Sequence, residues 1–297
     1  MSKPQRLREL LAGPAIAMPG AFNALSALQI ERLGFDALYV SGAGISASKG
    51  VPDIGLLSMT EMVAEARSIA GAVGIPALAD VDTGYGPPLN VMRTVREFEE
   101  AGVAGIQMED QENPKKCGHL SGKRLVAATE MAEKIAAAAR ARRDPAFVIV
   151  ARTDARAVEG PDGAVRRAVA YVKAGADAIF PEALESADEF KAFAQALSTQ
   201  GLKVPLIANM TEFGKSPSLT VKQFEALGYS VVLFPVSALR AAMKAMEVML
   251  ADLKTNGTLQ PWLGRMQTRQ QLYDLLRYAE YEQQDKDLHD RHGKESH

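Results

Sequence analysis

Short apolar segments alternate with helical segments eight times along the 297 residues, and this alternation limits the fold more than any other feature of the chain. Four apolar segments follow a glycine at the end of a helical pattern, at 33–40, 101–108, 174–180 and 227–234. A glycine at that place suits the left-handed cap of a helix C-terminus. Four more apolar segments begin at or just after a proline, at 14–18, 76–79, 145–151 and 205–208. The two kinds alternate, which predicts eight strands.

Segments with the 3.6-residue period of an amphipathic helix accompany these strands. They are 21–33, 59–72, 89–101, 126–141, 164–174, 187–197, 221–227 and 239–253. Apolar strands joined by helical crossovers indicate an α/β protein with a buried parallel sheet, and eight such units close a (β/α)8 TIM barrel. An open doubly wound sheet is the competing architecture, but no Gly-x-Gly-x-x-Gly motif opens the first helix.

The C-terminal segment exceeds what eight units require. Residues 268–287 again have a helical pattern, with Leu272, Leu275 and Leu276 on one stripe. We therefore expect residues 1–297 to form a single barrel domain, with 255–297 as a C-terminal helical extension. Such a helix packs on the barrel or is exchanged with a neighbouring subunit.

The composition excludes several classes of partner. Lys and Arg number 34 against 36 Asp and Glu, and no basic arm is present, so we expect no nucleic-acid partner. No segment approaches the roughly 20 apolar residues of a membrane span. The chain has one cysteine and hence no internal disulfide, which fits a cytoplasmic protein.

Polar residues follow almost every predicted strand. Because the carboxyl ends of barrel strands build the active site, these residues are candidates for chemistry. They include Ser41-Gly42-Ala43-Gly44, Asp80, Asp82, Glu109, Asp110, Arg152, Asp154, Glu182, Asn209, Thr211, Glu212 and Arg240. Any single one is equally explained as a helix cap or a surface charge. The complete ring favours an enzyme.

Asp80 and Asp82 form an Asp-x-Asp pair at a strand end, with Glu109 after the next strand. Carboxylates two residues apart point to the same side of a strand, where their repulsion calls for a cation. Oxygen ligands favour Mg²⁺, with Mn²⁺ as a substitute. Zinc is disfavoured, because Cys117 and His119 lack further Cys and His partners.

The only cysteine lies in Lys115-Lys116-Cys117-Gly118-His119. Neighbouring lysines and a histidine favour the reactive thiolate form. A chance cysteine in a solvated loop is the alternative. The glycines and lysines of this loop are also compatible with a lid over the site. No Gly-x-Ser-x-Gly motif supports a serine hydrolase, so Ser41 to Gly44 are better explained as backbone donors to an anionic oxygen.

Five of these motifs resemble the isocitrate lyase and phosphoenolpyruvate mutase superfamily over nearly the whole chain. The most specific is Lys115 to His119, which looks like the signature of the lyase branch. The others are 80–86, 109–111, 209–214 and 272–282. One departure is Ala43, where the family often has glycine. The resemblance implies a (β/α)8 barrel that forms a homotetramer with an exchanged helix.

The resemblance also implies the ligands of the site. Mg²⁺ is expected on Asp80, with Asp82 and Glu109 acting through water. The residues expected to contact substrate are Ser41, Gly42, Ala43, Cys117, Gly118, Arg152, Glu182, Asn209, Thr211, Arg240 and Arg269.

The implied reaction is Mg²⁺-dependent carbon–carbon cleavage of a tricarboxylate, 2-methylisocitrate, to pyruvate and succinate in propionate catabolism. Tyr39 or a metal-linked group would act as the base, and Cys117 would return a proton to carbon with Lys116 and His119 in support. The alternatives are 2,3-dimethylmalate or isocitrate cleavage, oxaloacetate decarboxylation, and a non-catalytic barrel that binds a dicarboxylate.

Overall fold

A computed structural model describes the backbone of residues 1–295 and the side chains of residues 1–289. The chain separates into two compact units, Met1–Leu239 and Arg240–His297. The sequence interpretation placed the start of the extension at 255, and that boundary stays a prediction. None of the described helices combines the length and apolar character that a membrane crossing requires.

All eight predicted strands are present in the first unit, and they are parallel. Their bounds are β1 Ile16–Ala21, β2 Leu38–Val40, β3 Ala77–Asp80, β4 Gly105–Glu109, β5 Val148–Thr153, β6 Ala178–Pro181, β7 Ile207–Asn209 and β8 Val231–Phe234. The order in the sheet is β6-β5-β4-β3-β2-β1-β8-β7. A parallel bridge between Ile179 and Leu206 brings β6 beside the start of β7, so the sheet nearly closes into a barrel. The predicted TIM barrel is confirmed.

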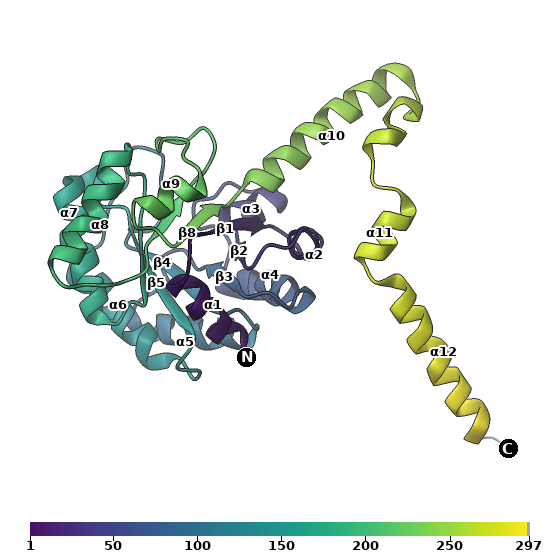
Figure 1. The fold of residues 1–297 in the computed structure, drawn as a ribbon, viewed down its shortest axis with the longest axis horizontal. Helices are drawn as coiled ribbons and strands as arrows, with labels where there is room; N and C mark the ends of the chain where they lie inside the picture. The colour runs from purple at the N-terminus through teal and green to yellow at the C-terminus, as the bar shows by residue number, and fades with distance from the viewer. Residues whose placement is uncertain (296–297) are drawn as a thin grey trace. The chain divides into compact units, whose positions relative to one another are not determined.

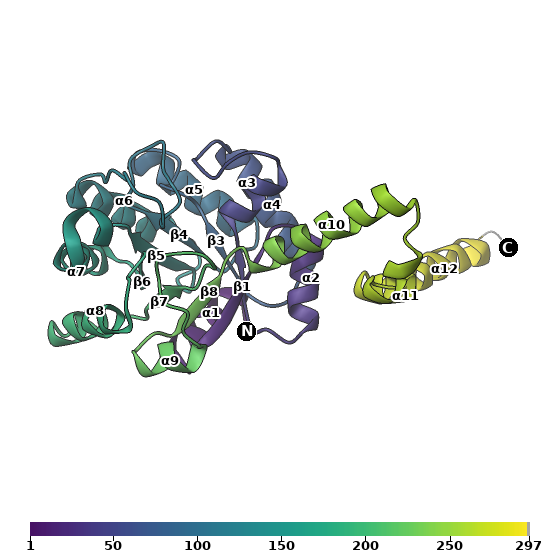
Figure 2. The same cartoon turned by 90° about the horizontal axis from the view of Figure 1, so that it is seen from above.

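Helices surround the strands, as Figures 1 and 2 show from two directions. Those of the first unit are α1 Lys3–Ala12, α2 Ala24–Arg32, α3 Gly42–Ser48, α4 Met59–Ala72, α5 Pro88–Glu100, α6 Ala128–Ala141, α7 Arg156–Ala174, α8 Ala187–Thr199 and α9 Val221–Ala226. The buried faces of α2 to α9 pack against the outside of the barrel in one large apolar cluster. The remaining helices are α10 Ser237–Asn256, a 3-10 helix η1 Gln260–Arg265, α11 Arg269–Leu275 and α12 Tyr278–Glu295.

The four glycines of the repeated helix-glycine-strand pattern have left-handed backbone angles. Gly34, Gly102, Gly175 and Gly228 have φ values of 82°, 86°, 111° and 93°. A side chain disfavours that conformation, so glycine lets the chain leave the helix and enter the next strand.

Helix α1 closes the amino-terminal end of the barrel. Its Leu7, Leu10 and Leu11 are buried in the inner apolar cluster. The same cluster contains the first residues of several strands, among them Val148 and Val231. Ser2 begins the helix with a capping box, because its Oγ accepts from the amide of Gln5 while the Gln5 side chain accepts from the amide of Ser2.

The second unit has its own contacts. Trp262 Nε1 donates to Asp252 Oδ2 at 2.7 Å, and the Arg265 guanidinium lies 5.3 Å from the Trp262 ring centre. The rings of Tyr273 and Tyr278 stack at 4.8 Å. The 20-residue helix α10 has no buried residue. Its large apolar side chains Met243, Met246, Val248, Leu250 and Leu253 are exposed.

Candidate active site

The carboxyl ends of neighbouring strands place the predicted polar residues close together. Asp80 ends β3, Glu109 ends β4, Arg152 lies near the end of β5, Glu182 follows β6 and Asn209 ends β7. All five are buried, with between 1% and 9% of their surfaces exposed. Such burial is unusual for charged side chains unless they are paired, and Arg152 is paired with both Glu109 and Glu182.

Arg152 is the central cation of this group. Its Nε lies 3.3 Å from Glu109 Oε2 and 3.0 Å from Asp154 Oδ2, and its Nη1 lies 3.2 Å from Glu182 Oε2. The guanidinium also lies 5.3 Å from the centre of the Phe180 ring. Burial alone would lower the pKa of Arg152, but the neighbouring charges, Asp154 first, raise it well above its usual value. Arg152 is therefore a fixed cation suited to a carboxylate ligand.

Glu182 links Arg152 to the loop that carries the cysteine. His119 Nδ1 accepts from the amide of Lys215 at 2.9 Å, which assigns the proton to His119 Nε2. That nitrogen lies 2.9 Å from Glu182 Oε1, and Asn209 Nδ2 donates to both oxygens of Glu182. Burial would raise the pKa of Glu182, but Arg152 and the His119 hydrogen bond outweigh it and lower the pKa to about 2. Glu182 is therefore an anion that orients its neighbours.

Asp80 and Asp82 form the acidic side of the site. The amide of Asp82 donates to Asp80 Oδ1 at 3.1 Å. β3 ends at Asp80, and Asp82 has a positive φ of 47°, so a turn and not strand alternation brings the two together. Burial, and then the charge of Asp82, raise the pKa of Asp80 to about 6. Burial also raises the pKa of Glu109 well above its usual range.

The segment after β2 forms helix α3, which is not among the helices predicted from the sequence. Ser41 is the N-cap of α3, and its Oγ accepts from the amide of Gly44 at 3.0 Å. The first amides of a helix have no acceptor within the helix, so Gly42 and Ala43 retain the expected capacity to bind an anionic oxygen. A side chain at residue 42 would come within 2.7 Å of Asp80 Oδ2, so only glycine fits there.

The cysteine loop lies over Arg152 and Glu182. A side chain at residue 118 would come within 2.5 Å of Arg152 Nη2 and 2.3 Å of Glu182 Cγ. Cys117, beside it, is exposed. This loop therefore brings Gly118, the residue directly after Cys117, against the Arg152 and Glu182 pair.

The two lysines before the cysteine differ in their surroundings. Lys116 is exposed, and its Nζ donates to the carbonyl of Gly122 within the same loop at 3.0 Å. Lys115 is the buried one: its Nζ pairs with Asp53 and lies 2.8 Å from Asp82 Oδ1. The structure thus brings Lys115 to the acidic side. The expected support of Cys117 by Lys116 stays a prediction.

Tyr39 is buried inside the barrel, and its hydroxyl donates to Gln107 Oε1 at 2.6 Å. Burial and the charge of Asp80 raise its pKa well above the usual value. A phenol that holds its proton so firmly is a hydrogen-bond donor. This arrangement does not favour the role of base that the sequence interpretation gave it.

The carboxylates fit a divalent cation that keeps much of its water. Among the described residues, no three His, Cys, Asp or Glu side chains are grouped so that they could hold one metal ion. Burial is the main cause of the raised pKa values of Asp80 and Glu109, and the attraction of Lys115 and Arg152 does not offset it. A bound cation would stabilise the charged form of both carboxylates. Mg²⁺ takes one or two carboxylates and several waters, which matches direct binding by Asp80 alone.

Three predicted residues are not placed at this cluster. Thr211 follows β7 by two residues. Arg240 and Arg269 belong to the second unit, so their contact with substrate stays a prediction.

The sequence interpretation missed several buried or half-buried polar side chains of the site. They are Asp53, Lys115, Gln107, Gln111, Lys123 and Asp154 as a partner of Arg152. These residues are hard to predict from the sequence, because their partners lie far away in the chain or in loops without periodicity. Gln111, in the motif with Glu109 and Asp110, was the one that could have been found.

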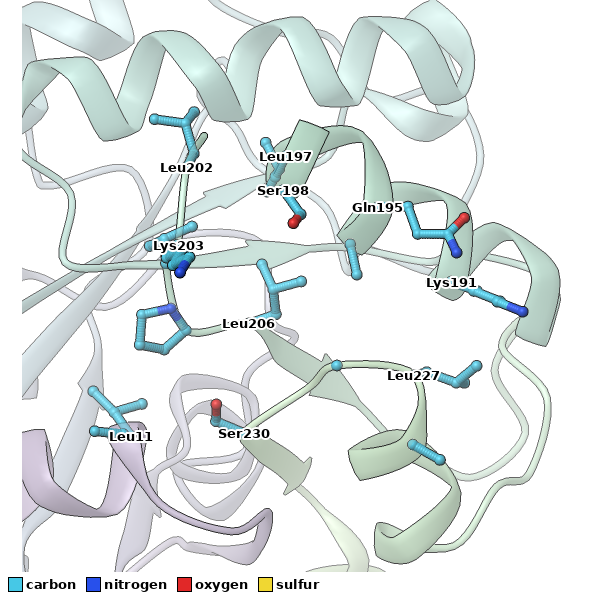
Figure 3. Close-up of a pocket in the computed structure, with 16 residues that line it drawn as sticks. Leu11, Lys191, Gln195, Leu197, Ser198, Leu202, Lys203, Leu206, Leu227 and Ser230 are labelled. Carbon is cyan, nitrogen blue, oxygen red and sulfur yellow. The ribbon is translucent and has the colours of Figure 1, made fainter. Parts of the chain in front are cut away.

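A cavity of about 600 Å³ lies at the opposite end of the barrel. Figure 3 shows that residues from α1, α8 and the segments before β7 and β8 surround it, including Leu11, Lys191, Lys203 and Leu206. Its two lysines are exposed. Residues before a barrel strand usually serve stability, so this cavity is separate from the candidate active site.

A barrel with buried carboxylates, a fixed arginine and a thiol at its strand ends is an enzyme that acts on an anionic small molecule. The family model described as "Phosphoenolpyruvate phosphomutase" matches residues 7–254. A relative named "2-methylisocitrate lyase" from Bacillus subtilis (strain 168) is 49% identical over 95% of this chain and 92% of its own.

Solved structures agree with this match. A 2,3-dimethylmalate lyase, titled a member of the PEP mutase/isocitrate lyase superfamily, has a TM-score of 0.90 at 35% identity and covers 97% of this chain and 96% of its own. A phosphonopyruvate hydrolase in complex with oxalate and Mg²⁺ has a TM-score of 0.86 at 36% identity, over 95% and 97%. The chain belongs to the phosphoenolpyruvate mutase and isocitrate lyase superfamily, and it is a carbon–carbon lyase.

Proposed function

We propose that this lyase cleaves 2-methylisocitrate to pyruvate and succinate in the methylcitrate cycle, with Mg²⁺ as its cofactor. The observation that carries the proposal is the position of the Cys117 loop over Arg152 and Glu182. It supplies a carboxylate-binding cation and a proton donor at one place. The relatives named 2-methylisocitrate lyase support the substrate.

The reaction requires transfer of the hydroxyl proton to a base, for which we propose a carboxylate of the metal-binding group Asp80, Asp82 and Glu109. It also requires cleavage of one carbon–carbon bond and protonation of carbon. The electron pair of that hydroxyl forms the carbonyl of pyruvate, and the electrons of the broken bond pass to the succinate carbon. Arg152 holds the pyruvate carboxylate, and the amides of Gly42 and Ala43 bind the developing carbonyl oxygen. Cys117 then gives its proton to the succinate carbon.

The other side chains orient these groups. Glu182 fixes His119 and Asn209 beside the loop, while Tyr39 keeps its proton and donates to Gln107. Asp80, with Asp82 and Glu109 through water, is proposed to hold Mg²⁺, which would polarise the 2-oxygen atom of the substrate. The hydrolase structure with oxalate and Mg²⁺ supports this cofactor.

We further propose a homotetramer in the cytoplasm that acts on small carboxylates, with residues 1–297 as one barrel domain extended by 255–297. The exposed apolar side chains of α10 support association with further copies.

One assay tests the substrate. The protein with Mg²⁺ is incubated separately with 2-methylisocitrate, isocitrate, 2,3-dimethylmalate and oxaloacetate, and the 2-oxo acid products are measured. We expect the highest kcat/KM with 2-methylisocitrate. Faster cleavage of 2,3-dimethylmalate would assign the activity named for the structural relative. If none is cleaved, a non-catalytic carboxylate-binding barrel becomes the better explanation.

A further inference from the structure

Two buried side chains hold the main chain on either side of Cys117. Gln111 Oε1 accepts from the amide of Lys116 at 2.9 Å, and Gln111 Nε2 donates to the carbonyl of the same residue at 2.8 Å. On the other side, Lys123 Nζ donates to the carbonyl of Gly118. We call Gln111 and Lys123 the anchors. They hold the main chain at residues 116 and 118, on the two sides of Cys117.

Each anchor side chain also contacts a carboxylate that pairs with Arg152. Gln111 Nε2 also lies 3.1 Å from Glu109 Oε1, and Lys123 Nζ lies 2.8 Å from Asp154 Oδ1. Glu109 and Asp154 in turn contact Arg152 Nε at 3.3 Å and 3.0 Å. The loop is therefore joined to the substrate-binding cation by two separate paths.

The burial of these groups gives the anchors definite positions. The side chains of Lys123 and Asp154 are 1% and 0% exposed, and Gln111 is 1% exposed. Buried polar groups without partners are costly, so each anchor keeps its bonds unless the loop moves as a whole. Gly118 contacts Arg152 and Glu182 closely, which leaves little room for displacement toward the barrel.

We propose that Gln111 and Lys123 are positioning residues that together set the place of the Cys117 thiol relative to Arg152. Neither side chain contacts the reacting atoms. They act through the main chain at residues 116 and 118, so their loss should impair proton delivery more than substrate binding. The kinetic part of this inference rests on the function proposed above, whereas the structural part does not.

The test uses the full chain with Mg²⁺ and three variants, Gln111→Met, Lys123→Met and Lys3→Met. Lys3 is the matched control, because its Nζ also donates to main-chain carbonyls, those of Ala70 and Val73. Amide hydrogen exchange of residues 113–122 reports on the loop. We expect about tenfold faster exchange there in the two anchor variants, and no change there in Lys3→Met.

Kinetics then separate positioning from general support. We expect kcat to fall about 10- to 100-fold in both anchor variants while KM changes less than about threefold. Lys123→Arg keeps a cation beside Asp154 and should recover part of kcat. If Lys123→Met does not fold, Gln111→Met provides the test, because that variant keeps the buried ion pair between Lys123 and Asp154.

Two results would overturn the inference. One is amide hydrogen exchange of residues 113–122 at the wild-type rate in both anchor variants. The other is faster exchange of these residues with an unchanged kcat. If the wild-type protein cleaves none of the substrates, the proposed function fails, but faster exchange confined to 113–122 would still support the anchoring.

Discussion

At the scale of single residues, burial and the charge of Asp82 make the ionised form of Asp80 unfavourable. Asp80 has a pKa of about 6 against an ordinary 3.8, through burial first and then the charge of Asp82. An acid whose pKa is higher in the folded protein binds its proton more tightly there. The proton on Asp80 therefore contributes its full stabilisation of the native state below about pH 4, and this stabilisation is lost as the pH rises through about 6.

The raised pKa of Asp80 leads to a prediction for the stability of the metal-free protein. Asp80→Asn removes the buried charge, so we expect the free energy of unfolding in chelator at pH 7.5 to rise by about 1 to 3 kcal/mol, and the gain to vanish near pH 4. Urea unfolding at both pH values measures it. Asp36→Asn is the control, because that carboxyl is 54% exposed. A variant less stable at pH 7.5 would contradict the assignment.

Cys117→Ser tests the proton donor. A serine hydroxyl holds its proton far more firmly than a thiol, so we expect kcat to fall about 10² to 10⁴-fold. Binding of pyruvate should be nearly unchanged, because Arg152 and the α3 amides remain. Steady-state kinetics and calorimetric titration with pyruvate measure the two effects. Full activity in this variant would refute the role of the thiol.

The candidate site was only partly predictable at this scale. Residues at the carboxyl ends of strands, such as Asp80, Glu109 and Arg152, follow from the barrel geometry once the strands are found. The cysteine loop has no periodicity, so the sequence cannot say that Lys115 turns inward and Lys116 outward. Pairs such as Lys115 with Asp53 join separate loops, and their encounter depends on the whole fold.

At the scale of elements, the barrel was predictable because each unit repeats its own signals. Four apolar strands follow a glycine cap and four begin at or just after a proline, and all eight strands were found. Helix α3 was missed, because its Gly42-Ala43-Gly44 start resembles a loop. Helix α7 begins at Arg156 and not at 164, since Gly160 and Pro161 form a kink that breaks its pattern.

Helix α1 supplies a prediction about stability without catalysis. Leu7 is 0% exposed in the inner cluster, at the end of the barrel away from the site. Leu7→Ala should lower the free energy of unfolding by about 2 to 5 kcal/mol, because it removes a buried side chain and leaves a cavity. We expect kcat to stay within about twofold of wild type. Leu33→Ala, at a 67% exposed position, is the control and should change stability by less than about 0.5 kcal/mol.

At the scale of the whole molecule, Mg²⁺ should couple to global stability. A ligand that binds only the folded state stabilises it by about 2.7 kcal/mol at 100 times its Kd. We expect Mg²⁺ to raise the melting temperature of wild type and to have no effect on Asp80→Ala. Thermal unfolding with Mg²⁺ or chelator measures this. An equal shift in both proteins would show that the ion binds elsewhere.

The second unit has exposed apolar side chains on α10. Helix α10 exposes Met243 and Leu250, seven residues apart and hence on one face, and large exposed apolar patches usually mark an interface. We expect the protein to sediment as a homotetramer, at four times the 31.9 kDa of one chain. Met243→Glu with Leu250→Glu places two charges on that face and should yield smaller species. Lys244→Gln, at an exposed polar position, should leave the mass unchanged. A wild-type monomer in sedimentation equilibrium would refute the tetramer, and the exposed face of α10 would then require a different partner.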